Sequence, residues 1–97
     1  MTHEIIHEGH STIGRYELAV DGEELPAMIS YTRPRDNVIY VNYARLPKGG
    51  KGIRAGQALA ARIVADAEAN GDSIVFTNHK VSELFERGED QRDQGVA

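Results

Sequence analysis

Hydrophobic and polar residues alternate along the first half of the chain with the two-residue period of β-strands. Tyr16, Leu18 and Val20 alternate with Arg15, Glu17 and Ala19, so one face of this segment is more apolar than the other. Asp21-Gly22 follows as a turn pair. The pattern predicts a half-buried strand over residues 15–20.

Two further strands are predicted before the middle of the chain. The first runs from about Ala27 to Thr32, and Pro34 with the polar residues after it ends the pattern. A β-branched and aromatic run from Val38 to Leu46 predicts the next strand, in the interior of a sheet, and Pro47 ends it.

The pattern then changes to the helical period. Between Ala55 and Asn70 the apolar residues Leu59, Ile63 and Ala67 recur at helical spacing. Gly71 stands where a left-handed C-terminal cap is expected. We therefore predict a helix over residues 55–70.

A short buried strand is predicted over Ser73 to Thr77, and Val81, Leu84 and Phe85 recur at helical spacing after it. A strand, a helix and a second strand form a crossover, which implies parallel pairing of the two strands. The predicted fold is α+β, an α/β sandwich in which antiparallel strands lead into a β-loop-α-β unit. Residues 1–97 form one small domain without repeats, and residues 88–97 are expected to be a frayed tail.

The composition is that of an ordinary globular protein. Of 97 residues, 40% are hydrophobic and 27% are charged, which disfavours disorder. The chain has no cysteine, which excludes disulfides, thiolate zinc sites and a cysteine nucleophile and makes a reducing cytoplasm the expected compartment. We find neither a signal-peptide pattern nor an apolar run long enough to span a membrane.

Three histidines near the N-terminus raise the question of a metal site. His3, His7 and His10 would align on a helix, but Gly9 and β-prone neighbours disfavour a helix there. We therefore expect no metal site, and we interpret the spacing as fortuitous.

A glycine-rich basic segment, residues 46–59, joins the third predicted strand to the helix. The chain carries 15 acidic and 11 basic residues, yet no acidic residue lies between Asp36 and Asp66. That interval contains Arg45, Lys48, Lys51, Arg54 and Arg62. A net charge of −4 disfavours a nucleic-acid partner, whereas glycines and a helix N-terminus are typical of a phosphate site. The alternative is a solvated basic loop without a ligand.

The order of elements and this segment resemble the small single-domain branch of the GCN5-related N-acetyltransferase (GNAT) family. The resemblance covers about Tyr16 to Arg87. It is carried by Asp21-Gly22, by a strand ending in Tyr31, by Leu46-Pro47, and by Lys51-Gly52-Ile53-Arg54-Ala55-Gly56 at the family's Arg-Gly-Gln-Gly-Ile-Gly loop. It implies an acyl-CoA N-acyltransferase-like fold and transfer of an acetyl group from acetyl-CoA to an amine, without a metal.

The resemblance also implies which residues hold the cosubstrate. Backbone N–H groups of Gly52 to Gly56 would bind the pyrophosphate, and the pantetheine arm would pair along the strand near Tyr43 to Leu46. The complete predicted binding set is Tyr43, Ala44, Arg45, Leu46, Lys51, Gly52, Ile53, Arg54, Ala55, Gly56 and Gln57.

The chain departs from the family at two positions. Arg54 stands where the family has its second glycine, and the sequence leaves two outcomes open: a blocked approach to the pyrophosphate, or a guanidinium that donates to it. Asn78 stands where this branch commonly has a cysteine, so a thiol mechanism is excluded. His79 is then the candidate base, and Tyr43 is the candidate proton donor to the leaving thiolate.

Each catalytic candidate also has a purely structural interpretation. Asn78 suits the N-cap of a helix beginning near Lys80, His79 suits a surface turn, and Tyr43 suits a strand with a solvated hydroxyl. The alternatives to an acetyltransferase are therefore a non-catalytic module that binds CoA or another nucleotide, and a protein-interaction module whose basic loop contacts an acidic partner. The acceptor amine is not identified, no membrane partner is expected, and both a monomer and a homodimer fit the sequence.

Overall fold

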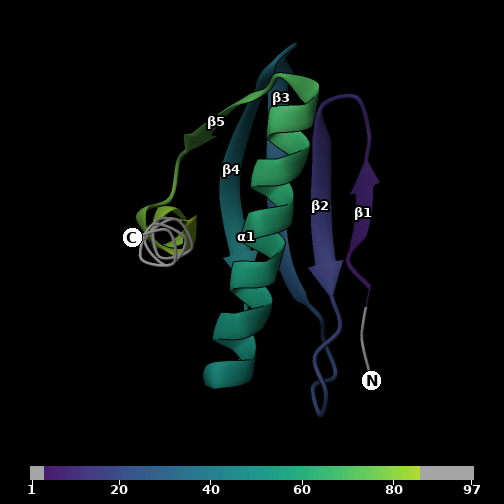
Figure 1. The fold of residues 1–97 in the computed structure, drawn as a ribbon, viewed down its shortest axis with the longest axis vertical. Helices are drawn as coiled ribbons and strands as arrows, with labels where there is room; N and C mark the ends of the chain where they lie inside the picture. The colour runs from purple at the N-terminus through teal and green to yellow at the C-terminus, as the bar shows by residue number, and fades with distance from the viewer. Residues whose placement is uncertain (1–3, 86–97) are drawn as a thin grey trace.

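The computed structural model describes residues 4–85, which form one five-stranded sheet and one long helix (Figure 1). Residues 79–85 are also helical. Neither helical segment in this part of the chain combines the length and apolar character needed to cross a membrane. The elements are β1 (Ile6–Gly9), β2 (Ile13–Leu18), β3 (Ala27–Arg35), β4 (Val38–Arg45), α1 (Gly50–Asn70) and β5 (Ser73–Phe76).

The strands lie in the sheet in the order β1-β2-β3-β4-β5. The first four are joined by antiparallel pairing, while β4 and β5 are parallel. The chain passes from β4 through α1 to β5, so the predicted crossover is confirmed, and β4 lies in the sheet interior as expected. The fold is a small α+β domain with a mixed sheet.

Helix α1 lies across one face of the sheet (Figure 1) and buries the apolar side chains of that face. Ile29, Val41, Leu59 and Ile63 are the largest fully buried side chains, and the helical residues Leu59 and Ile63 are among those predicted from the periodicity. Phe85 joins the same core and packs on Phe76, with ring centroids 4.8 Å apart.

The other face, which we call the open face, is covered by no helix of the described chain. Glu8, Arg15, Ser30 and Tyr43 lie across it in one cross-strand row, because each is the register partner of the next. Side chains alternate between the faces of a strand, so their neighbours Tyr16, Ile29 and Ala44 point toward α1.

Several strand boundaries differ from the predictions. Strand β1 was not expected, and β2 covers Ile13–Leu18 rather than 15–20. Strand β3 continues through Pro34 to Arg35, because Pro34 lies in the irregular register between Thr32 and Arg35, where its missing N–H costs no regular ladder bond. The N-terminal end of β4 matches the prediction, and its C-terminal end is Arg45.

The helix begins five residues earlier than predicted. It starts at Gly50 instead of Ala55, so the segment expected to be a loop forms its first turns. Its C-terminal end agrees with the prediction, since Gly71 has φ 72° and its N–H donates to the Glu68 carbonyl. The tail predicted for residues 88–97 lies outside the described residues.

An aromatic and ionic cluster ties β1, β2, β3 and α1 together. The His7 ring stacks on Tyr16 with centroids 4.0 Å apart, and Nε2 of His7 lies 2.7 Å from the Tyr31 hydroxyl. The Tyr16 hydroxyl donates to Asp66 on α1 at 2.7 Å, and Arg62 donates to the same carboxylate. Burial by itself raises the pKa of Asp66, but the hydrogen bonds from Tyr16 and Arg62 outweigh it and hold that pKa below its ordinary value.

This cluster predicts that stability falls as the solution is acidified. Burial lowers the pKa of His7 below its ordinary value of 6.5, so protonation is harder in the folded chain than in the unfolded one. The stabilisation is therefore present above the unfolded pKa and is lost as pH falls through the folded pKa. His7→Phe keeps a ring on Tyr16 and does not titrate.

The measurement is urea unfolding of the wild type and His7→Phe at about pH 7.5 and about pH 5.5. We expect the wild type to lose more unfolding free energy between these two pH values than the variant loses. An equal loss in both proteins would show that His7 is not the titrating group.

Candidate functional site

The pairing between β4 and β5 ends halfway along β4. The last register pair joins Val41 to Phe76, and the Thr77 N–H donates to the Val41 carbonyl at 3.3 Å. Beyond this point residues 43–45 of β4 pair with β3, but no strand of the described chain lies on their other side. Their backbone presents a free strand edge to which an extended chain of amides can bind.

A β-bulge precedes this free edge. Tyr43 pairs with Ser30 and Val41 pairs with Tyr31, so Asn42 is the extra residue. The Asn42 amide donates to the Thr32 hydroxyl at 3.3 Å. The bulge turns Tyr43 to the open face, where 49% of the residue is exposed, so the structure places this predicted site residue at the surface rather than in the core.

The free edge leads through Leu46 and Pro47 to the N-terminus of α1. The helix is preceded by Gly49 at φ 89°, it has no side-chain cap, and its first turn contains no acidic residue. The Ile53 N–H already donates to the Gly49 carbonyl at 3.2 Å. The donors left for an anion are therefore the N–H groups of residues 50–52, at the positive end of the helix dipole.

This corrects the predicted set of phosphate donors. From residue 53 onward the backbone N–H groups belong to the helical hydrogen-bond pattern, so Ile53, Arg54, Ala55 and Gly56 do not offer them to a ligand. Ile53, Arg54 and Ala55 are tolerated inside a helix, so only the glycines of its first turns, Gly50, Gly52 and Gly56, carry a propensity cost.

Two of the three glycines within the helix, Gly52 and Gly56, are required by packing. A Cβ on Gly52 would overlap the carbonyl oxygen of Pro47, and one on Gly56 would lie 2.8 Å from a methyl group of Leu46 and 3.3 Å from one of Leu84. Both glycines are buried. Because they have no side chain, the segment after β4 can lie directly on α1. The glycine pattern is therefore explained by close backbone packing.

Three of the five predicted cations surround the helix start. Lys48, Lys51 and Arg54 are exposed there, and a guanidinium nitrogen of Arg54 lies 3.5 Å from the position of a Cβ on Gly50. Thus Arg54 extends back toward the free N–H groups, which favours its interpretation as a donor. Arg62 is three helical turns away, about 18 Å along the axis, and pairs with Asp66 at 3.1 Å.

Arg45, the last residue of β4, has an unusual environment. One guanidinium nitrogen donates to the Pro26 carbonyl at 3.4 Å, while the buried Nε has no hydrogen-bond partner among residues 4–85. Arg45 is the register partner of Met28 on the open face, so its side chain lies on the opposite side of the sheet from α1.

The two catalytic candidates after β5, Asn78 and His79, have structural contacts in the described chain. The Asn78 side chain accepts the Lys80 N–H at 2.9 Å, which confirms Asn78 as the N-cap of the helical residues 79–85. The side chain of His79 is 85% exposed and lies 3.1 Å from Glu83. Asn78 still follows Thr77, which bonds to Val41, so it lies close to the start of the free edge.

The other predicted binding residues differ in exposure: some face the core and others face the solvent. Ala44 and Leu46 are half-buried and pack against the core, and Ala55 is buried. Ile53 is 44% exposed, and Gln57 is half-buried. The structure therefore brings together the end of β4 and the first turn of α1, with only part of the predicted set facing outward.

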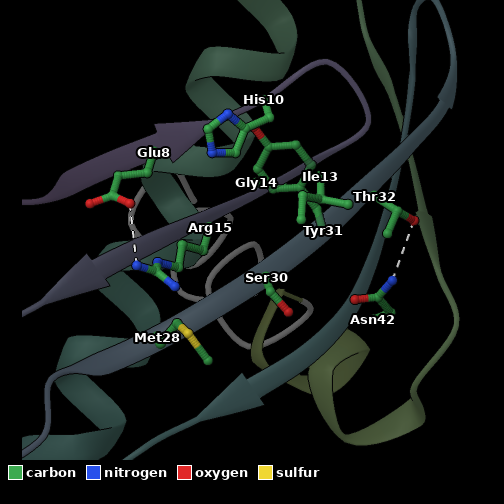
Figure 2. A pocket seen from close by; sticks show the side chains of 10 residues that line it. All are labelled: Glu8, His10, Ile13, Gly14, Arg15, Met28, Ser30, Tyr31, Thr32 and Asn42. Carbon is green, nitrogen blue, oxygen red and sulfur yellow. Dashed lines mark hydrogen bonds and ion pairs between the residues drawn. The ribbon is translucent and has the colours of Figure 1, made fainter.

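Sequence reasoning missed two features. One is the Tyr16–Asp66 contact, for which the only local signal is the Arg62–Asp66 spacing of four residues. The other is a hollow of about 500 Å³ on the open face, lined among others by Arg15, Ser30 and Asn42 (Figure 2). Its residues come from four strands, so only the sheet register reveals it.

Comparison of the chain with protein-family models, with curated proteins and with solved structures gave no match. A free strand edge can bind amides, and three N–H groups with three nearby cations can bind an anion.

The packing of Gly52 generates a stability prediction with a matched control. Gly52→Ala forces the new methyl group against the Pro47 carbonyl, and we expect a loss of about 1 to 3 kcal/mol in unfolding free energy. Gly50→Ala places the same methyl group near the flexible end of Arg54 and should be neutral or stabilising by up to about 1 kcal/mol. Urea unfolding measures both, and equal effects would contradict the close approach at Gly52.

Proposed function

We propose that this protein binds acetyl-CoA in an acyl-CoA N-acyltransferase-like fold and transfers the acetyl group to an amine. The observation that carries the proposal is the direct continuation of the free edge of β4 into the uncapped, basic N-terminus of α1. A long cosubstrate with amides at one end and phosphates at the other matches this sequence of groups. The resemblance to the GNAT family supports the same assignment.

The phosphates would be held at the start of α1. The N–H groups of Gly50, Lys51 and Gly52 point out of the first turn, as in any helix N-terminus, and the cations Lys51 and Arg54 lie beside them. Lys51 contacts the Asp21 carbonyl at 3.5 Å, a long contact that it can exchange for a phosphate oxygen.

The pantetheine arm would pair with the free edge at Tyr43 to Leu46. Its two amides can donate to and accept from a strand backbone in the manner of an added strand. Such pairing uses the backbone, so it is compatible with the inward-facing side chains of Ala44 and Leu46. It would end near the Asn42 bulge, which places the thioester where β4 and β5 separate.

Transfer then requires one addition and one elimination. The amine nitrogen forms a bond to the thioester carbon, and the C–S bond breaks as the tetrahedral intermediate collapses. The amine proton passes to a base, and the thiolate takes a proton. A backbone N–H at the bulge would stabilise the oxyanion. Tyr43, which follows the bulge residue Asn42 and is exposed on the open face, is the remaining candidate for protonating the thiolate.

A second candidate function is a module that binds CoA or a nucleotide without transfer. One observation favours it: Asn78 is engaged as a helix cap and His79 pairs with Glu83 at the surface, so neither lies ready as a base. The lack of a base would not affect binding of the cosubstrate by the helix start and the free edge.

Binding is tested by calorimetric titration with acetyl-CoA. We expect micromolar affinity in the wild type and about tenfold weaker binding in Arg54→Glu, because a carboxylate replaces the guanidinium that lies beside Gly50 at the start of α1. Arg35→Glu makes the same charge change at the exposed end of β3 and should change the affinity less than about twofold.

The outcomes of this titration separate the alternatives. No heat with the wild type would refute both the acetyltransferase and the CoA-binding module, and would leave the protein-interaction module. Equal weakening in both arginine variants would show a general charge effect rather than a phosphate site at the start of α1.

Transfer is tested by thiol release from acetyl-CoA in the presence of a panel of amines. The chain contains no cysteine, so every thiol detected with a thiol reagent comes from CoA. We expect release that depends on the amine and falls at least about tenfold in Tyr43→Phe while the affinity for acetyl-CoA is kept. Binding without release for any amine would identify the non-catalytic module.

A further inference from the structure

The open face exposes large apolar side chains that no helix of the described chain covers. Ile6 is 57% exposed, Ile13 is 55% exposed and Tyr43 is 49% exposed. All three point away from α1, because their register partners Glu17, Thr32 and Ser30 lie on the same face. Exposed apolar groups gathered on one sheet face are typical of an interaction surface.

The open face is also hollowed in two places. The hollow of about 500 Å³ has Ile13 and Met28 in its lining (Figure 2). A second one, of about 420 Å³, is lined by Ile6 and Glu17 near the turn between β2 and β3. Glu17 and Met28 are register partners, so the two hollows adjoin along β2 and β3 and can receive side chains of one partner.

The linings of the two hollows are strongly negative. Five carboxylates line the two hollows against one guanidinium, that of Arg15. Arg15 is already shared, at 3.2 Å from Glu8 and 3.4 Å from Glu17. The remaining three, Glu4, Glu23 and Glu24, make no side-chain hydrogen bond or ion pair within residues 4–85.

We infer that the open face docks a basic amphipathic helix of a partner protein. The apolar side of such a helix would cover Ile6, Ile13 and Met28, as α1 covers the opposite face. Its lysines and arginines would meet the carboxylates at the margin of the hollows. A second copy fits less well, since it would bring one acidic face against another. The inference does not rest on acetyl-CoA binding, whose proposed contacts are the edge of β4 and the start of α1; Tyr43 is a residue that belongs to both surfaces.

The test uses a fluorescein-labelled 18-residue helical peptide, about 27 Å long, with leucines along one side and lysines and arginines on the others. Its binding is measured by fluorescence anisotropy at about 0.15 M salt. A second peptide with glutamates in place of the cations controls for purely apolar binding. We expect saturable one-to-one binding of the basic peptide and none of the acidic one.

Matched variants locate the binding surface. Ile13→Ser and Glu24→Lys change the open face, and each should weaken binding about fivefold or more. Ile53→Ser and Glu68→Lys make the same changes at exposed positions of α1 and should leave the affinity within about twofold. All four positions are exposed, and circular dichroism verifies the fold of each variant.

Three results would overturn the inference. The first is no binding of the basic peptide, and the second is equal weakening by the open-face and α1 variants, which would indicate unspecific attraction to an acidic chain. The third is a stable dimer in sedimentation equilibrium that Ile13→Ser dissociates, because the open face would then belong to a second copy.

Discussion

One-sided burial of the sheet is the constraint on which the rest of this structure depends. Residues 4–85 supply one long helix, and that helix can cover only one face of a five-stranded sheet. In the described chain, the only buried layer lies between the sheet and α1. Its centre is formed by Ile29 and Val41 from the sheet and by Leu59 and Ile63 from α1. Burying these side chains places α1 across β2 and β3, and no helix within residues 4–85 covers the opposite face.

The same constraint positions the candidate site. To reach the sheet, α1 must begin directly after β4, and this is possible because Gly52 lets the helix lie on the Pro47 carbonyl. The close approach leaves the first-turn N–H groups next to the end of β4. After α1 the chain continues as β5, whose pairing with β4 ends at Val41. The free edge of β4 and the position of the helix start are therefore consequences of one packing arrangement.

Polar groups reinforce the layer at its margin. Tyr16 is buried beneath α1 and would lose hydrogen-bonding capacity there without Asp66, whose carboxylate accepts from it at 2.7 Å. Stacking of His7 on Tyr16 and its contact with Tyr31 attach the edge strand β1 to the same layer. The short, exposed β1 is thus held by side chains as well as by its backbone pairing.

The sequence by itself determined the helix end at Gly71, the interior strand from Val38 and the parallel return of β5, because periodicity and a left-handed glycine act over a few residues. It left Asn78 with two interpretations, a catalytic residue and a helix cap. It could not determine where α1 begins, since Gly52 and Gly56 indicate a loop locally and their close contacts are with Pro47, Leu46 and Leu84. Nor could it show which donors of the segment remain free, that β3 passes through Pro34, or that four strands form a hollow on the open face. Those features depend on register and on contacts between residues distant in sequence, and only the tertiary structure decides them.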